Sequence, residues 1–492
     1  MQHILAVDQS TSGTKALLFD ATGKLTAASS ISHRQHYPRP GWVEHDAEEI
    51  YRNVVEAVRS VLEKRGARAQ DLLCLSIANQ RETFVVFDRA TGRPLHNAIV
   101  WQCRRGSELC ERLIEGGQGD DIRRITGLQV DTYFSASKIK WLLDSRPDIR
   151  QAVLSGRALI GTMDAYLVFR LTGGAVFATD HTNASRTLLY DIGKLRWSKK
   201  LCDLFGVPAY SLPEVRESSA EYGETTVDGL LEQSIPVCGV MGDQQAALFA
   251  QGCFSPGAAK VTLGTGAFIL LNAGRHFRPA EQGILTTIAW VYRGETTYAF
   301  EGSINCAGAT ISWLQDQLGL IDDPSASEKL ATAIPDNDGV YLVPAFAGLG
   351  APYWKQDARA AILGLTLHSS RHHIARAALE SIAYQIRDVL DTMAAGGRVP
   401  LEVIRADGGV VHNAFVMQFT ADLTGLRVRV STLQDVTALG AAMAGALGMG
   451  VYSSLTDLDQ MPREFVDYSP AMAPEVVASN YAGWRAAVQR VL

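Results

Sequence analysis

The stretch Ile4-Leu5-Ala6-Val7-Asp8-Gln9-Ser10-Thr11-Ser12-Gly13-Thr14-Lys15-Ala16-Leu17-Leu18-Phe19 decides the fold class. Two apolar runs of strand length flank a turn of small polar residues, a pattern that predicts a β-hairpin. A second stretch of this form begins at Lys260, where an apolar run, the turn Gly264-Thr265-Gly266 and another apolar run follow one another. One such hairpin near the start of each half indicates two copies of one architecture.

The segments outside the hairpins alternate between strand and helix. Apolar residues at helical spacing predict helices over 50–64, 137–143 and 374–393. Continuous apolar runs of strand length occupy 72–78 and 83–87. Strands that alternate with helices in this way indicate an α/β protein.

The length and composition narrow the class of protein. A chain of 492 residues exceeds a single hydrophobic core, so we expect two domains, 1–250 and 251–492. The 46 Lys and Arg against 52 Asp and Glu leave a net charge of −6, which argues against electrostatic binding of nucleic acid. The seven cysteines are odd in number and lie mostly in apolar stretches. They favour reduced core thiols in a cytoplasmic protein over a disulfide framework.

The sequence does not favour insertion into a membrane. The chain enters a strand-like run almost at once, so we expect no leader peptide. The most apolar stretch, 438–451, is rich in Ala and Gly and shorter than the roughly 20 residues that span a bilayer. We expect it to be a helix packed closely in the core.

Several well-known catalytic motifs are absent from the sequence. There is no G-x-x-x-x-G-K-[ST] phosphate loop, no complete G-x-G-x-x-G after a strand, no H-E-x-x-H and no G-x-S-x-G. P-loop proteins, NAD enzymes, zinc hydrolases and serine hydrolases are therefore disfavoured.

Three turns of small residues are candidates for binding an anion. They are Ser10–Thr14, which Lys15 follows, Gly264–Gly266 and Asp407-Gly408-Gly409. Small residues let backbone N–H groups approach a phosphate closely. Each turn alone is more often a simple tight turn, but three of them, two on matched hairpins, indicate phosphate binding.

Two aspartates stand where strands are expected to end. Asp8 ends the first strand, where its carboxylate could hold a hydrated Mg²⁺. Asp243 follows an apolar run and begins a helical segment. Aspartate is also favoured as a helix cap, and a cap at a strand's carboxyl end can still face a ligand.

These residues carry a resemblance to a known family. The matching segments are Asp8–Lys15, 40–46, 79–83, 98–105, 133–135, 180–186, 242–247, 264–268, 344–354 and 481–484. With them the chain is identified as a member of the FGGY carbohydrate kinases, and within that family it resembles the members that phosphorylate glycerol. The matches run in order along essentially the whole chain.

The resemblance implies two actin/Hsp70-like (ribonuclease H-like) domains with ATP in the cleft between them. It implies transfer of the γ-phosphoryl group to glycerol, with Asp243 as the base and Mg²⁺ near Asp8 and Asp243. By position, the implied glycerol contacts are Arg81, Glu82, Trp101, Tyr133, Asp243, Gln244 and Phe268. The implied nucleotide contacts are Thr11, Ser12, Gly13, Lys15, Thr265, Gly308, Ser312, Gly409 and Asn413. We also expect a homo-oligomer, either a dimer or a tetramer.

The chemistry of these residue types suits a triol. Arg81 donates hydrogen bonds, Glu82 accepts them, and Tyr133 can do either. Trp101 and Phe268 would cover the C–H face and exclude water. On spacing alone, the aromatic residues would more often pack in a core and the adjacent Arg81 and Glu82 would more often lie exposed.

The sequence departs from the family pattern at a few positions. The family usually has Gly-Thr-Thr where Ser10–Ser12 stands, Arg in place of Lys15 and Gln in place of Ser312. Some bacterial members bind fructose 1,6-bisphosphate through a loop with Gly and Arg. Here the matching loop, Asp228–Gln233, has no Arg, so we expect no response to that sugar.

Two other functions remain open at this point. A kinase for another polyol or sugar, such as erythritol or xylulose, would use the same fold. A non-transferring ATPase or scaffold of the actin/Hsp70 type would turn over ATP without glycerol.

Overall fold

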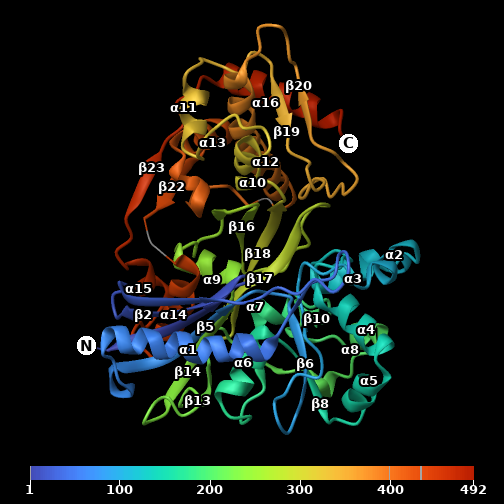
Figure 1. Ribbon diagram of the computed structural model, residues 1–492, viewed down its shortest axis with the longest axis vertical. Coiled ribbons are helices and arrows are strands. Elements are labelled where there is room, and N and C mark those ends of the chain that lie inside the picture. Colours follow the sequence, from blue (N-terminus) through green and yellow to red (C-terminus); the bar gives the residue numbers. More distant parts are fainter. Residues whose placement is uncertain (1, 398, 433–434) are drawn as a thin grey trace.

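The computed structural model describes residues 2–397, 399–432 and 435–492, and Figure 1 shows them in two lobes. The first lobe is built around a sheet whose strands lie in the order β13 (Glu221–Thr225), β14 (Ile235–Gly242), β5 (Leu72–Asn79), β1 (His3–Gln9), β2 (Gly13–Asp20) and β3 (Leu25–Ser32). The second lobe is built around β17 (Leu285–Tyr292), β18 (Glu295–Ile304), β16 (Ala267–Gly274), β15 (Ala258–Leu263), β21 (Val403–Asp407), β22 (Arg427–Ser431) and β23 (Phe465–Tyr468). Most of the first lobe is blue to green and most of the second is yellow to red in Figure 1, but helix α14 (Val436–Gly448), late in the sequence, lies against the first-lobe sheet.

The two central sheets repeat one topology. In the first, β1 is antiparallel to β2, β2 is antiparallel to β3, and β5 and β14 run parallel to β1. In the second, β15, β16 and β18 form the antiparallel part, and β21 and β22 run parallel to β15. Both predicted hairpins are confirmed, and the shared strand order confirms two copies of one α/β architecture.

Smaller sheets complete the fold. Beside the first sheet lie β4 (Glu44–His45), β7 (Ala98–Ile99), β6 (Phe84–Asp88) and β8 (Ala158–Thr162) in that order. The remaining pairs are β9 (Ala178–Asp180) with β12 (Glu214–Arg216), β10 (Tyr190–Asp191) with β11 (Arg196–Trp197), and β19 (Tyr341–Val343) with β20 (Ala361–Leu363).

Helices cover the sheets and form most connections. In the first half they are α1 (Ala47–Arg65), α2 (Ser107–Glu115), α3 (Gly119–Thr126), α4 (Ser135–Ser145), α5 (Pro147–Leu154), α6 (Met163–Leu171), α7 (His181–Ala184), α8 (Lys199–Phe205) and α9 (Asp243–Ala250). In the second half they are α10 (Gly308–Asp316), α11 (Ala326–Thr332), α12 (Arg371–Gly397), α13 (Ala414–Thr424), α14 (Val436–Gly448), α15 (Leu455–Asp459) and α16 (Pro474–Gln489). No helix in this described part of the chain is long and apolar enough to cross a membrane.

The helix predicted over 50–64 shows how local signals set an element. It is α1, and Asp46 caps it by accepting hydrogen bonds from the backbone N–H groups of Glu48 (2.9 Å) and Glu49 (3.2 Å). Its apolar stripe is buried, and Gly66 ends it with a φ of 68°, in the left-handed region that glycine adopts without strain.

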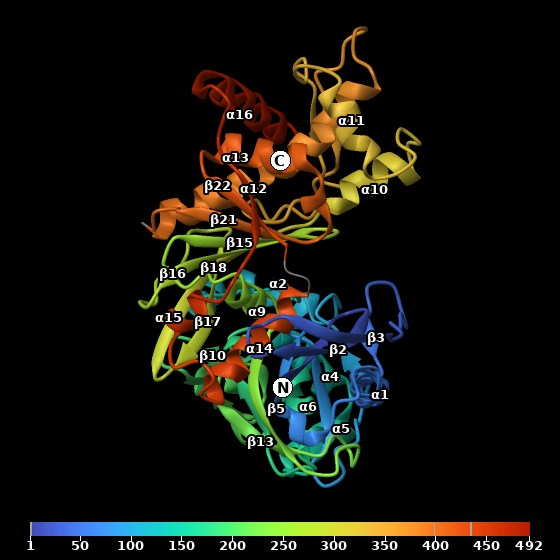
Figure 2. The same ribbon diagram turned by 90° about the vertical axis from the view of Figure 1, so that its left-hand side faces the viewer.

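Helix α14 joins the two halves of the sequence. It comes late in the chain, yet it packs against β14, β5 and β1 of the first lobe and against α9, and its orange-red ribbon lies among blue and green strands in Figure 2. A Cβ atom at Gly440 would lie 1.9 Å from the backbone oxygen of Ala246 in α9, so only glycine permits this approach. The core helix predicted over 438–451 is confirmed as far as Gly448, where α14 ends, and residues 449–451 lie beyond it.

All seven cysteines are buried and free. Burial raises the pKa of the Cys74 thiol, for example, to about 12. The structure agrees with the expectation of reduced core thiols.

Candidate active site

The turn between β1 and β2 is held by side chains from other segments. The indole Nε1 of Trp101 donates to the hydroxyl of Thr11 at 3.0 Å, and the backbone oxygen of Thr11 accepts a hydrogen bond from His33 Nε2 at 2.9 Å. A Cβ atom at Gly13 would lie 2.9 Å from the backbone oxygen of Ile31. The turn is thus fixed in place, while Ser12 at its tip is exposed.

Arg81 and Glu82 follow β5 and are buried, with 3% and 2% of their surface exposed. The exposed charge pair that spacing alone would favour is therefore excluded. Glu82 has a φ of 62°, a left-handed conformation that is uncommon for residues other than glycine and often marks a functional site.

The guanidinium of Arg81 is gripped by Glu301, which arrives from β18 of the second sheet. Nη1 and Nη2 donate to the two carboxylate oxygens of Glu301 at 2.5 and 3.0 Å. Further N–H groups donate to Gln245 and to the hydroxyl of Tyr133, both at 3.2 Å. This bidentate geometry fixes the plane of the guanidinium.

One N–H group of Arg81 is left facing carboxylates of the site. Its Nε lies 3.3 Å from Asp243 Oδ1 and 3.8 Å from Glu82 Oε1. Arg81 therefore draws together the two carboxylates expected to hold the acceptor.

A second buried arginine completes the charge cluster. Arg186 donates from Nε to Glu82 at 2.6 Å and from Nη2 to Glu301 at 2.8 Å. Burial would raise the pKa of Glu301, but the charges of Arg186 and Arg81 outweigh it and lower that pKa to about 2. Burial dominates at Glu82 and raises its pKa. Two arginines and two glutamates thus balance each other in a site closed to solvent.

Asp243 is the first residue of α9. The cap position belongs to Gly242, so the interpretation of Asp243 as the helix cap is wrong. Its Oδ1 accepts from the backbone N–H of Gln244 at 2.7 Å and lies beside Arg81. No described residue donates to Oδ2, and the side chain is 28% exposed, so this oxygen can accept a proton from a ligand.

Trp101 and Tyr133 stand edge to face, with ring centroids 5.6 Å apart. Beneath them the buried Lys138 donates to the backbone oxygens of Tyr133 at 3.1 Å, Trp101 at 3.4 Å and Thr132. Burial lowers the pKa of Lys138 to about 8. Both aromatic residues are half-buried, and Lys138 fixes the backbone that carries them, which suits a wall of a small pocket.

A third group of charges lies around Asp8. Burial and then the negative charge of Asp243 raise the pKa of Asp8 to about 7, and the charge of Lys15 opposes them. Lys15 itself donates to Asp435, which precedes α14, at 2.5 Å. The lysine predicted to meet phosphate is thus already oriented by a carboxylate.

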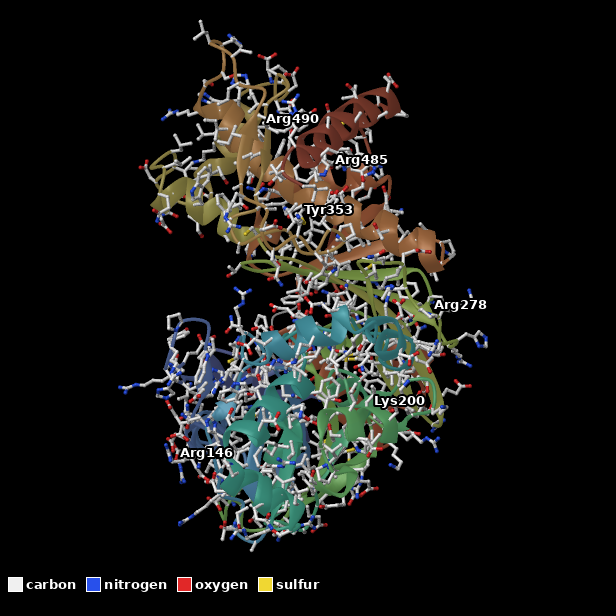
Figure 3. The ribbon with its side chains drawn as sticks, turned by 90° about the vertical axis from the view of Figure 1, so that its right-hand side faces the viewer. Arg146, Lys200, Arg278, Tyr353, Arg485 and Arg490 are labelled. Atoms are coloured by element: carbon white, nitrogen blue, oxygen red, sulfur yellow. The ribbon has the colours of Figure 1, made fainter. Side chains whose placement is uncertain are left out.

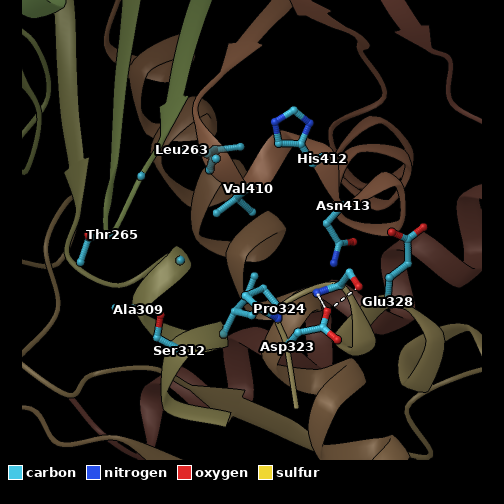
Figure 4. A pocket seen from close by; sticks show the side chains of 15 residues that line it. Leu263, Thr265, Ala309, Ser312, Asp323, Pro324, Glu328, Val410, His412 and Asn413 are labelled. Carbon is cyan, nitrogen blue, oxygen red and sulfur yellow. Dashed lines mark hydrogen bonds between the residues drawn. The ribbon is translucent and has the colours of Figure 1, made fainter. Parts of the chain in front are cut away.

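The second lobe holds a cavity of about 600 Å³ (Figure 4). Five of the predicted nucleotide contacts line it: Thr265, Gly308, Ser312, Gly409 and Asn413. The first residue of α10 contacts the Gly264–Gly266 turn, because Gly308 N–H donates a hydrogen bond to Gly264 O at 2.9 Å. Asn413 caps α13 by accepting from Val416 N–H at 3.1 Å, which fixes its place in the wall.

The cavity wall mixes apolar and polar groups. Leu263, Ile311 and Val410 offer apolar surface, and Asp323, Glu328 and others offer polar atoms at the rim. A flat heteroaromatic base with a polar edge fits such a lining.

The sites in the two lobes meet through α9 and β15. Gln244 accepts a hydrogen bond at 2.6 Å from Lys260, a buried lysine of β15, which also donates to Thr262 at 2.8 Å. Phe268 pairs with Thr262 across the hairpin. Among the described residues, no hydrogen bond directly joins the cluster of Arg81, Glu82 and Asp243 to the five predicted nucleotide contacts that line the cavity.

Comparison with known proteins places this geometry in a family. The model of the N-terminal domain of FGGY carbohydrate kinases matches residues 3–250, and that of the C-terminal domain matches residues 259–449. The chain belongs to the FGGY family of carbohydrate kinases.

Individual relatives extend over the full length. Glycerol kinase 1 of Thermotoga maritima is 46% identical over 491 residues, which are 100% of this chain and 99% of that protein. Glycerol kinase of Halorhodospira halophila is 48% identical, covering 99% of this chain and 96% of that protein. The crystal structure of Plasmodium falciparum glycerol kinase with ADP superimposes with a TM-score of 0.95 at 38% identity, covering 100% of this chain and 98% of that one.

Several residues of this FGGY site escaped prediction as site residues. Glu301, Arg186, Lys138 and Lys260 are all fully buried charges that contact predicted residues. Two of them left a signal, since Lys260 is the one charge in the largely apolar strand β15 and Glu301 directly follows the apolar run 298–300 in β18. Such a charge is rarely buried without a partner.

Proposed function

We propose that this FGGY kinase transfers the γ-phosphoryl group of ATP to glycerol and forms sn-glycerol 3-phosphate. The observation that carries the proposal is the small acceptor site in the first lobe. There the carboxylates of Glu82 and Asp243 flank Arg81 Nε, and Trp101 and Tyr133 provide an aromatic wall. The full-length similarity to proteins named glycerol kinase supports the same acceptor.

The charge pattern suits a polyol rather than an acid. A triol needs several donors and acceptors within one small volume. Glu82 and Asp243 supply acceptors, whereas most donors of Arg81 are already taken by Glu301, Gln245 and Tyr133. A carboxylate substrate would find little free positive charge here, so we infer a neutral acceptor.

Asp243 orients the attacking hydroxyl and receives its proton. The hydroxyl oxygen forms a bond to the γ-phosphorus while the bond from that phosphorus to the β–γ bridging oxygen breaks, and ADP leaves with the electron pair. Because the proton can leave late in a loose transition state, orientation matters more than basicity. Arg81 Nε, 3.3 Å from Oδ1, holds the carboxylate in place.

The two turns and Lys15 hold the triphosphate. Backbone N–H groups of the β1–β2 turn and of Gly264–Gly266 offer donors to phosphate oxygens. Lys15 offsets the charge of the transferring group, a main contribution in such reactions. We infer that adenosine occupies the cavity of the second lobe, where Gly409 and Asn413 lie.

Asp8 and Asp243 fit a magnesium ion. Their carboxylates lie close enough for the charge of one to raise the pKa of the other, and a hydrated Mg²⁺ favours one or two carboxylates together with phosphate oxygens. The ion would supply charge neutralisation on the phosphates. The expected readout is loss of transfer in excess chelator and recovery on adding Mg²⁺.

A panel of acceptors tests the proposal. Purified protein with ATP and Mg²⁺ is given glycerol, erythritol, xylulose or gluconate, and ADP release and product are both measured. We expect glycerol to have the highest kcat/KM. A four- or five-carbon acceptor with a higher value would overturn the glycerol assignment, and ATP turnover unaffected by any acceptor would point to a non-transferring ATPase.

We also propose an oligomeric state and a location for the protein. A dimer or tetramer should appear in sedimentation velocity, and a monomer at micromolar concentration would contradict it. A cytoplasmic location fits the seven buried free thiols, and cell fractionation checks it.

A further inference from the structure

The segment 180–186 is one of those that match the family, yet the proposed transfer reaction gives none of its residues a contact with substrate, phosphate or metal. Asp180 ends β9, is fully buried and caps the short helix α7. Its carboxylate accepts five hydrogen bonds, from Thr182 N (3.0 Å), Thr182 Oγ1 (2.8 Å), Asn183 N (2.9 Å), Asn183 Nδ2 (3.0 Å) and Ser218 Oγ (2.8 Å). A helix of four residues does not need so many partners for its cap.

One of these partners reaches the residue before the base. The hydroxyl of Thr182, oriented by its hydrogen bond to Asp180, accepts the backbone N–H of Gly242 at 2.8 Å. Gly242 ends β14, and Asp243 follows it directly. The position of Asp243 at the start of α9 is therefore tied to Asp180 through one side chain.

Another partner reaches the strand that delivers Arg81. The side-chain amides of Asn183 and Asn79 exchange two hydrogen bonds, at 2.9 and 3.0 Å. Asn79 also donates to the backbone oxygen of Gln80 at 2.9 Å, immediately before Arg81. All of these side chains are buried, so water does not compete for the contacts.

The end of the segment touches the site itself. Arg186 donates to Glu82 and Glu301 at 2.6 and 2.8 Å. From Asp180 to Arg186, one short stretch thus contacts the ends of β14 and β5 and the buried charge cluster.

We propose that Asp180 is a positioning residue that sets the distance between the base Asp243 and the acceptor residues Arg81 and Glu82 by holding Thr182 and Asn183. The inference rests on the proposed function. Asp180 does not touch the substrates; it acts through two buried side chains, each one hydrogen bond from a strand end. An asparagine at this position would keep the shape but would turn an N–H₂ group toward donors, so both links would lose their anchor.

The first experiment compares Asp180→Asn with Asp388→Asn. Asp388 is also a buried carboxylate, held by Tyr353 at 2.9 Å, Tyr481 at 2.6 Å and Trp484 at 2.8 Å in the second lobe, and Figure 3 labels Tyr353 there. Since small misplacements in an active site reduce rates strongly, we expect Asp180→Asn to lower kcat by about tenfold or more and to raise KM for glycerol. KM for ATP should stay near the wild-type value in both variants, and Asp388→Asn should change neither kinetic constant for glycerol.

The second experiment isolates one link and does not depend on Asp180→Asn folding. Thr182→Val keeps the shape but removes the hydroxyl that accepts from Gly242, and Thr182→Ser keeps the hydroxyl. We expect kcat to fall about fivefold or more in Thr182→Val, the scale of one lost hydrogen bond in a buried site, and to be rescued in Thr182→Ser. KM for ATP should be unchanged in both.

The outcomes distinguish a failure of the proposed function from a failure of the positioning role of Asp180. Wild-type turnover with glycerol is measured first, and its absence would overturn the proposed function; the variants are then compared with the acceptor that the panel identifies. Equal losses in Asp180→Asn and Asp388→Asn, or in Thr182→Val and Thr182→Ser, would overturn the positioning role. A fall in kcat confined to Asp180→Asn and Thr182→Val would support it.

Discussion

The two hairpin turns share a place in the same topology but differ in chemistry. The β1–β2 turn carries hydroxyls and a lysine, and it is bound to Trp101 of the acceptor site. The β15–β16 turn has two glycines, receives the start of α10 and lines the 600 Å³ cavity. In the proposed function, the duplicated scaffold serves two tasks: the first lobe binds the acceptor and the second lobe binds adenosine, while one turn from each lobe contacts the phosphates.

The added segments explain the difference. In the first lobe, the chain between β5 and β14 includes β6 to β13 and α2 to α8, and it supplies Arg186 and the aromatic wall. In the second, the connections between β18 and β21 supply α10, α11 and the rim of the cavity. The inserted segments therefore supply part of each site, whereas Asp8, Lys15 and Asp243 lie on or directly after strands of the shared order.

The largest effect should come from substituting Asp243, the proposed general base. Asp243→Asn keeps the size of the side chain and removes its proton acceptor, so we expect kcat to fall by about 10³-fold, within the range for a general base. Nucleotide binding should persist, because the cavity lies in the other lobe. Steady-state kinetics and titration with a fluorescent ATP analogue check both statements.

Asp144→Asn is the control for this substitution, since that carboxylate lies at the surface and pairs with Lys140 at 3.0 Å. Transfer by Asp243→Asn within tenfold of the wild type would show that Asp243 is not the base.

The next effect should come from the lysine of the first turn. Lys15→Met removes a charge expected beside the transferring phosphoryl group, and we expect kcat to fall about tenfold to a hundredfold. Lys15→Arg keeps the charge and should stay within about fivefold of the wild type. If both variants match the wild type, the pairing of Lys15 with Asp435 is structural and the lysine does not serve the phosphates.

A third substitution should affect only the second lobe. A Cβ atom at Gly308 would lie 2.6 Å from Gly264 O, so Gly308→Ala would push α10 away from the turn, and we expect KM for ATP to rise about tenfold. KM for glycerol should not change. Gly119→Ala, at a site with open space around the added methyl group, is the matched control. A larger change for glycerol than for ATP would contradict the division of tasks.

Local sequence patterns predict some features of this protein and not others. The hairpins and α1 follow from local patterns, because apolar spacing, Asp46 and Gly66 act within a few residues of each other. Arg81 and Trp101 came from the family resemblance rather than from spacing, whereas Asp243 was singled out by its place after an apolar run and owes only its role as base to the resemblance. The partnership of Arg81 with Glu301 joins residues 220 positions apart, and a single sequence holds no signal for such a pairing.

The placement of α14 was also beyond local signals. Its composition predicts close packing, and its glycines permit it, but nothing in the stretch indicates that it packs on the sheet of the other half. Interactions that depend on how distant segments meet require the structure.

The last prediction is that fructose 1,6-bisphosphate has no effect on the rate. Fructose 1,6-bisphosphate at millimolar concentration should leave the rate unchanged, because Asp228–Gln233 contains no arginine. Residues 230–233 do line a cavity of about 450 Å³ with Arg59 and Arg68, so the assay is informative. Strong inhibition that disappears when this loop is mutated would refute the prediction.

The most direct measurement is a crystal structure with glycerol and a non-hydrolysable ATP analogue bound together. We predict a glycerol hydroxyl within about 3.2 Å of Asp243 Oδ2, facing the terminal phosphorus, with adenosine in the cavity between Thr265 and Asn413. Glycerol bound away from Asp243 and Glu82, or a nucleotide outside that cavity, would contradict the assignment of one task to each lobe.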